Sequence, residues 1–150
     1  MSFSTPQQVE LKVQKGIRQS EDKLVLWIQD ALDNSKYKKP DNTSKKSKDK
    51  LEESQFRNLV RVSDTTESPE VVKNFLRYQV GRDDKWGRGS GSLAERIITD
   101  IDGNLKTRAQ AITRDANGGN ASEIHIELIR RYLGYGARYL KYLNSLTEQS

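Results

Sequence analysis

Apolar residues recur along the first part of the chain with a helical period. Six of them stand four or seven positions apart: Val9, Val13, Ile17, Leu24, Ile28 and Leu32. This spacing places their side chains on one face of an amphipathic helix. The pattern therefore predicts either one long helix or a pair of helices that break near Gly16.

Two shorter helices are predicted next. The first should run from about Lys50 to Ser63, and its inward-facing residues should be Leu51, Phe56, Leu59, Val60 and Val62. At the second, Ser68-Pro69-Glu70 offers a capping side chain, a proline for the first helical position and an acid for the first turn. This helix should end at Gly81, and its buried face should hold Val71, Val72, Phe75, Leu76 and Val80.

Four of the ten glycines lie between Gly81 and Gly91, where no apolar periodicity remains, so this stretch predicts a loop. A fourth helix should follow from Ser92, which has capping-box spacing to Glu95, and should continue until Asn117.

A fifth helix should start at Asn120, three residues before Glu123. No stretch shows a strand-like alternation of apolar and polar residues. The fold class is therefore all-α. At this length we expect residues 1–150 to form a single domain, a compact bundle of about five helices.

The formal net charge of +5 is concentrated in one stretch. Between Lys36 and Lys50, seven lysines stand against two aspartates, and this excess equals the whole net charge. Almost no apolar side chain there offsets the entropy of ordering. We interpret residues 35–50 as a flexible basic linker that would add salt-sensitive, sequence-blind affinity to a nucleic acid bound by the folded part.

Composition also excludes several kinds of chemistry. Without cysteine the chain has no disulfide, thiolate metal site or cysteine nucleophile, and a single histidine, His125, cannot form a histidine cluster. We interpret the acidic pairs Asp83-Asp84 and Asp100-Asp102 as solvated charge, because such spacings rarely converge on one substrate. The glycine loop lacks the ending of a nucleotide P-loop. We predict no enzymatic activity, no metal and no cofactor.

The sequence gives no sign of a membrane or secreted protein. No apolar run approaches the roughly 20 residues needed to cross a bilayer. The first six residues lack the basic-then-apolar order of a secretory signal. We expect a cytoplasmic protein with neither a membrane partner nor a small-molecule substrate.

The loop around Trp86 points towards nucleic acid. Arg82, Lys85 and Arg88 flank this tryptophan among glycines. If exposed, the indole can stack on a base, which is worth about 1–3 kcal/mol, while the cations contact phosphates. The alternative is that Trp86 folds back to cap the core.

The last helix offers a second basic face. Arg131 and Arg138 stand seven positions apart and so share one side of the helix, along which a nucleic-acid backbone could run. The alternative is a solvated outer face whose tyrosines lie half in the core.

Two segments resemble a known family. Ser54-Gln55-Phe56-Arg57-Asn58-Leu59-Val60 is followed by Val71–Arg82, which ends in Tyr78-Gln79-Val80-Gly81-Arg82. They resemble the small helical subunit of type III CRISPR effector complexes, in which an SQ-x-R-N-like helix start precedes a helix ending in Tyr-x-x-x-Arg. The resemblance covers roughly residues 54–143.

The resemblance implies a non-catalytic, RNA-binding structural subunit of an RNA-guided interference complex. Copies of such a subunit stack on one another beside other effector subunits and stabilise the duplex of guide RNA and target RNA. Base pairing reads the sequence, so the protein needs only backbone contacts. The residues implied on the RNA side are Arg57, Arg61, Arg77, Arg82, Lys85 and Arg88, with Arg131 and Arg138 as second candidates.

Two alternatives remain open. The basic block and the helices would also serve a free-standing DNA-binding or plasmid-maintenance protein, although the connection at residues 64–68 is too acidic to lie comfortably against phosphate. A helical adaptor that binds only protein would tolerate charge reversal in the Trp86 loop.

Overall fold

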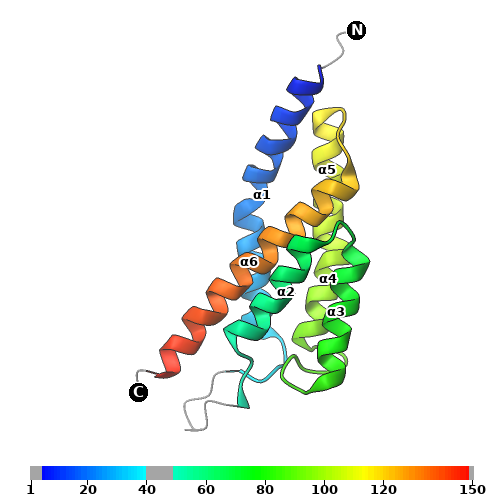
Figure 1. Cartoon of the computed structure of the whole chain (residues 1–150). Helices are drawn as coiled ribbons and strands as arrows, with labels where there is room; N and C mark the ends of the chain where they lie inside the picture. Colours follow the sequence, from blue (N-terminus) through cyan, green and yellow to red (C-terminus); the bar gives the residue numbers. More distant parts are fainter. Residues whose placement is uncertain (1–4, 40–48, 149–150) are drawn as a thin grey trace.

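The computed structural model describes residues 5–39 and 49–148, and within them the chain is helical, without a named strand. Five rods follow one another (Figure 1), which confirms the predicted all-α bundle. The fourth rod is continuous and contains one π-helical turn. The elements are α1 (Pro6–Asn34), α2 (Glu53–Thr65), α3 (Pro69–Arg82), α4 (Leu93–Asp100), η2 (Ile101–Leu105), α5 (Lys106–Ala116) and α6 (Ala121–Glu148).

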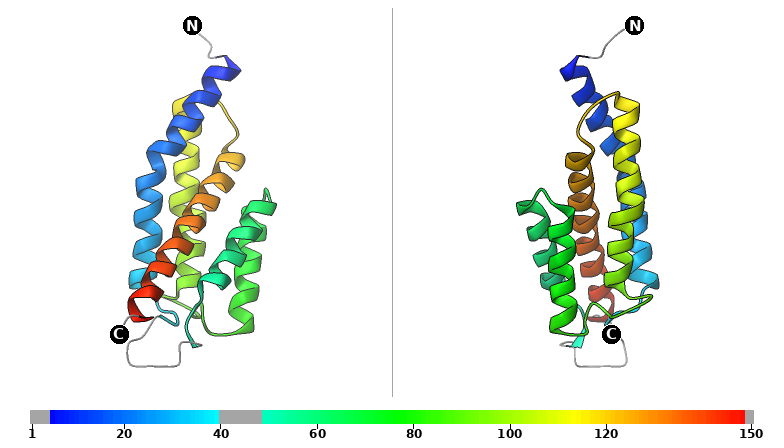
Figure 2. Two further views of the ribbon diagram at one scale, coloured as in Figure 1. Left: turned by 60° about the vertical axis from the view of Figure 1, so that its left-hand side comes forward. Right: turned by 90° about the vertical axis from the view of Figure 1, so that its right-hand side faces the viewer.

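The rods form two groups around α6 (Figure 2). On one side α1 and the α4–η2–α5 rod lie alongside each other, and α6 contacts both. On the other side α2 and α3 form a hairpin, in which α2 packs against α6 and α3 contacts α4. Apolar side chains from every rod meet in one core, so the hairpin is fixed to the rest of the bundle.

The N-terminal segment is one helix and is not broken at Gly16. Its start is capped by Thr5, whose hydroxyl accepts from the Gln8 backbone N–H at 3.1 Å, while the Gln8 side chain accepts from the Thr5 N–H at 2.8 Å. Gly16 instead lets α5 approach, because a Cβ added there would lie 3.0 Å from the Ile112 side chain.

The later helix boundaries agree with the sequence signals. The Ser92 hydroxyl accepts from the Glu95 N–H at 3.2 Å, and α5 ends where Asn117 adopts a left-handed conformation with φ of 55°. The Asn120 side chain accepts from the backbone N–H groups of Ser122 and Glu123. The fourth helical rod therefore begins and ends, and the fifth begins, through local capping contacts.

Part of the predicted flexible linker is packed, so that interpretation is wrong for residues 35–39 and 49–50. The Lys36 N–H donates to the Gly91 carbonyl at 2.8 Å, and its carbonyl accepts from the Leu93 N–H at 3.0 Å. Tyr37 packs against the core and donates to the Leu32 carbonyl at 2.8 Å. Lys50 is 8% exposed. Residues 40–48 of the predicted linker lie outside the described residues.

One inward-facing position of α3 differs from the prediction. Val71 is 47% exposed, whereas Lys73 is only 5% exposed. The Lys73 ammonium donates to Asp102 at 2.7 Å and pairs with Glu70 at 2.6 Å. Burial of a cation is tolerated when it is paired and hydrogen-bonded, so α3 is rotated to place Lys73 inward and Val71 outward.

Candidate nucleic-acid interface

Four of the predicted binding residues lie exposed on the α2–α3 hairpin: Arg57, Arg61, Arg77 and Arg82. Arg57 pairs with Glu53 at 3.0 Å, and Arg61 donates to the Asn58 side chain at 3.2 Å. Within the part of the chain that the structure describes, the Arg77 side chain has no hydrogen bond or ion pair. The hairpin therefore keeps several of its cations available to an external anion.

An exposed tyrosine on α3 was missed by the sequence interpretation. Tyr78 is 58% exposed, and the Arg82 guanidinium lies 5.8 Å from the centre of its ring. The signal in the sequence was the spacing of four between these residues, which places them on one helix face.

The glycine loop and the first lysines of the basic stretch come together at one end of the bundle. The Lys38 N–H donates to the Lys85 carbonyl at 3.1 Å. The Lys85 side chain is half-buried, and Arg88 is exposed and donates to the Asp83 carbonyl at 3.4 Å. Two basic segments that are far apart in the sequence thus form one surface beside the end of α3.

Trp86 is buried, so the prediction that it stacks on a base is wrong and the alternative, that it caps the core, is confirmed. Its exposed fraction is 0%, and its ring centre lies 5.3 Å from that of Phe56. Gly87 has φ of 78°, a conformation that glycine adopts without strain. A side chain at Gly87 would collide with the Lys36 carbonyl. The loop can therefore turn tightly and direct the indole inward.

On α6, only one of the two predicted arginines is available. The Arg131 guanidinium is bound by Glu21 of α1 and by Glu127, the latter at 3.0 Å. Since the contact with Glu21 joins α6 to α1, Arg131 cross-links the bundle and is not a free phosphate contact. Arg138 is exposed and lies 5.9 Å from the centre of the Tyr135 ring.

An open groove of about 360 Å³ runs between α2 and α6. Arg130 does not add a free charge to it, because its guanidinium donates to the backbone carbonyls of Ser63 and Thr66 at 2.7 and 2.9 Å. Among the described residues, Arg138 is the cation lining this groove that has no carboxylate partner. The groove is lined by Val60, Asp64, Glu127, Arg130, Arg131, Gly134, Tyr135 and Arg138.

A second, smaller groove of about 210 Å³ lies between α1 and α5. Lys12, Lys15 and Arg108 line it together with Asp115. The sequence interpretation missed this basic site, because its residues lie far apart along the chain. Arg108 is held in place by a hydrogen bond of 2.6 Å to the Ser20 hydroxyl.

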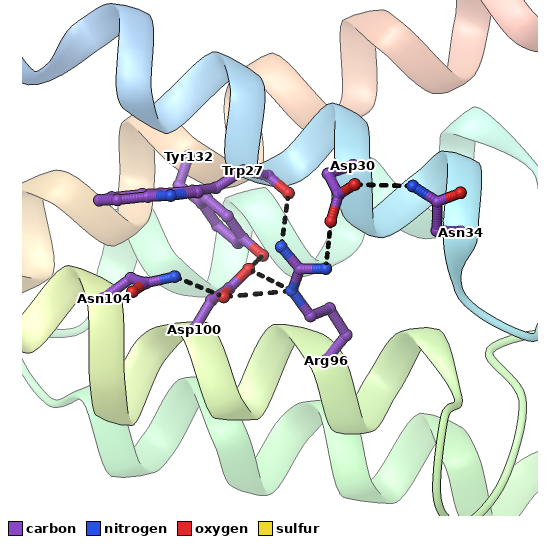
Figure 3. Close-up of polar contacts among 7 residues, drawn as sticks. All are labelled: Trp27, Asp30, Asn34, Arg96, Asp100, Asn104 and Tyr132. Carbon is purple, nitrogen blue, oxygen red and sulfur yellow. Dashed lines mark hydrogen bonds and ion pairs between the residues drawn. The ribbon is translucent and has the colours of Figure 1, made fainter.

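Asp100 belongs to a buried polar cluster, so its interpretation as solvated charge is wrong. Its side chain is 2% exposed and accepts from Tyr132, Arg96 and Asn104 (Figure 3). The Arg96 guanidinium also donates to the Asp30 carboxylate at 2.6 Å, and this hydrogen bond lowers the pKa of Asp30. The carboxylate of Asp100 is fully engaged: it joins α4 to α6 through Tyr132 and, through Arg96, to α1.

His125 is buried beside the π-helical turn. Its Nε2 lies 2.7 Å from the Ile101 carbonyl, and since a carbonyl only accepts, this nitrogen carries the proton. Burial lowers the pKa of His125, and the hydrogen bond to Ile101 opposes this effect. The folded protein therefore favours the neutral ring.

Stability should fall as the pH drops below the unfolded-state pKa of His125. A His with a lowered pKa in the fold contributes stability above about pH 6.5, and that contribution is lost towards the folded-state pKa, at up to about 1.4 kcal/mol per pH unit. Urea unfolding of the wild type and of His125→Gln, which keeps a donor for Ile101, measures the difference. Parallel pH profiles of the two proteins would contradict this expectation.

Comparisons of the chain with models of protein families, with curated proteins and with solved structures found no match. Within residues 5–39 and 49–148, no group of three or more His, Asp or Glu side chains could hold a metal ion. None of the described helices is long and apolar enough to cross a membrane.

Proposed function

We propose that the protein is a non-catalytic RNA-binding subunit of a type III CRISPR effector complex. It holds the duplex of guide RNA and target RNA through backbone contacts, beside other effector subunits and neighbouring copies of itself. The family assignment rests on the resemblance of residues 54–60 and 71–82.

The observation that carries the proposal is a set of exposed arginines without a carboxylate partner on the α2–α3 hairpin and its adjoining loop. In the described part of the chain these are Arg61, Arg77, Arg82 and Arg88. Guanidinium groups that are not neutralised by acids bind phosphates and release the counterions of the nucleic acid. The surface offers no base-reading motif, which suits a partner whose sequence is read by pairing.

The three acids of α3 and its adjoining loop do not cancel this charge, because each already has a partner. Glu70 pairs with Lys73, and the Asp83 carboxylate accepts from the Lys85 N–H at 2.9 Å. Asp84 lies 3.6 Å from the Lys38 ammonium. A phosphate approaching the end of α3 therefore meets available cations before it meets an available carboxylate.

Removal of these four arginines should abolish most RNA binding. We expect the variant Arg61→Ala/Arg77→Ala/Arg82→Ala/Arg88→Ala to bind at least about tenfold more weakly than wild type at moderate salt. Its slope of log affinity against log salt should be smaller by about 3, since each lost phosphate contact accounts for about 0.7–0.9. Fluorescence anisotropy with a labelled single-stranded RNA, the same RNA as a duplex, and a matched DNA duplex measures both quantities.

A matched control removes four other exposed cations, from α1 and α5: Arg18→Ala/Lys23→Ala/Lys106→Ala/Arg114→Ala. This variant has the same net charge as the test variant, so equal losses in both would mean attraction by net charge and no defined site. Tighter binding to the DNA duplex would favour the free-standing DNA-binding protein. Absence of nucleic-acid binding by the wild type would leave the protein-only adaptor.

A further inference from the structure

The outer side of α3 carries an exposed aromatic side chain, Tyr78, that the proposed contacts with the RNA backbone do not require. Tyr78 is 58% exposed although Phe75 lies beside it, with ring centres 6.3 Å apart, and Arg82 lies over its ring. These two contacts hold the phenol ring in place while most of it remains accessible. A side chain ordered before binding loses less entropy when a ligand stacks on it.

The surroundings of Tyr78 suit a nucleotide. A base has an apolar face that stacks on an aromatic ring, and it carries a phosphate that a neighbouring guanidinium can bind. Arg77 directly precedes Tyr78, and Arg82 follows it by four residues. Neither arginine has a carboxylate partner within residues 5–39 and 49–148.

We infer that Tyr78 and Arg82 form a stacking site for one unpaired nucleotide of RNA. This inference rests on the proposed RNA binding and adds to it a preference for an unpaired base over a fully paired one. The Tyr78 ring stacks on the base, while Arg82 contacts the adjacent phosphate. Trp86, which the sequence favoured for this role, is fully buried and cannot take it.

The decisive variants are Tyr78→Ala, Tyr78→Phe and Tyr142→Ala. Tyr142 is a matched control, because it is a tyrosine of α6 with 55% exposure, lies beside Tyr139 and, within the described residues, has no cation over its ring. Each protein is titrated into a single-stranded RNA that contains 2-aminopurine and into a blunt RNA duplex of the same length. Circular dichroism checks that each variant is folded, which is expected since both rings are exposed.

Tyr78→Ala should bind the single strand about 5- to 100-fold more weakly, the equivalent of about 1–3 kcal/mol for one stacked base, with an unchanged salt slope. Its affinity for the blunt duplex should equal that of the wild type. Tyr78→Phe should restore single-strand binding and the quenching of 2-aminopurine. Arg82→Ala should instead lower the salt slope by about 0.7.

Four results would overturn the inference. If Tyr78→Ala binds RNA as tightly as the wild type, the stacking site is contradicted while the proposed RNA binding stands. The same conclusion follows if Tyr142→Ala weakens RNA binding by the same factor as Tyr78→Ala. An effect of Tyr78→Ala on self-association in sedimentation, without an effect on RNA, would assign this surface to a protein contact. Failure of the wild type to bind any RNA would overturn the inference together with the proposed function.

Discussion

Replacing Asp100 with alanine should lower the free energy of unfolding by about 2–4 kcal/mol, because three donors in the bundle lose an acceptor. The Tyr132 hydroxyl, 0% exposed, donates to Asp100 at 2.6 Å, and Arg96 lies 3.1 Å from the same carboxylate. Arg96 keeps Asp30 as a partner, so the larger part of the loss comes from the stranded Tyr132 hydroxyl. Urea unfolding followed by circular dichroism measures the change.

Two further variants separate the cluster from general effects of substitution. Tyr132→Phe removes one hydrogen bond but leaves the Arg96–Asp100 contact, so we expect a loss of about 0.5–2 kcal/mol. Asp22→Ala removes an exposed acid of α1 and should change stability by less than about 0.5 kcal/mol. If Asp100→Ala behaves like Asp22→Ala, the cluster does not hold the helices together.

The helix boundaries could be predicted because their signals are local. Ser92 and Asn120 cap the helices that follow them through backbone groups two or three residues away. The stop at residues 117–119 depends on left-handed backbone that asparagine and glycine favour. Such contacts need no knowledge of the rest of the fold.

The position of the basic stretch could not be predicted, because it depends on a contact between distant segments. Lys36 and Lys38 pair through their backbones with the loop at residues 85–93, and Tyr37 packs against the core. Composition alone favoured disorder there. The backbone hydrogen bonds and one half-buried aromatic ring offset the entropy of ordering that the lysine side chains do not.

The candidate site could be predicted only in part, because some of its contacts also join distant segments of the chain. Exposure of Arg61, Arg77 and Arg82 follows from the helical period that buries Phe56, Leu59 and Leu76. The ion pair between Arg131 and Glu21 joins residues 110 positions apart, and no local sequence pattern predicts it. A pattern therefore indicates which cations are outside the core but not which of them are already neutralised.

Trp86→Ala should lower the free energy of unfolding by about 3–5 kcal/mol, since it deletes one of the largest fully buried side chains and leaves a cavity beside Phe56. Trp86→Phe keeps most of the apolar contact and should cost less. Chemical unfolding measures both. In a Trp27→Phe background, Trp86 becomes the reporter of fluorescence, and it should be protected from iodide with or without RNA.

The same variants decide between the two interpretations of the loop. A buried Trp86 affects RNA only through folding, so Trp86→Phe should bind RNA as the wild type does under conditions where both are folded. A stacking Trp86 would produce the opposite pattern: RNA affinity would fall about 5- to 100-fold on replacement by alanine while stability stayed unchanged. Because Tyr78 is exposed and Trp86 is not, RNA affinity should respond to Tyr78→Ala and stability to Trp86→Ala.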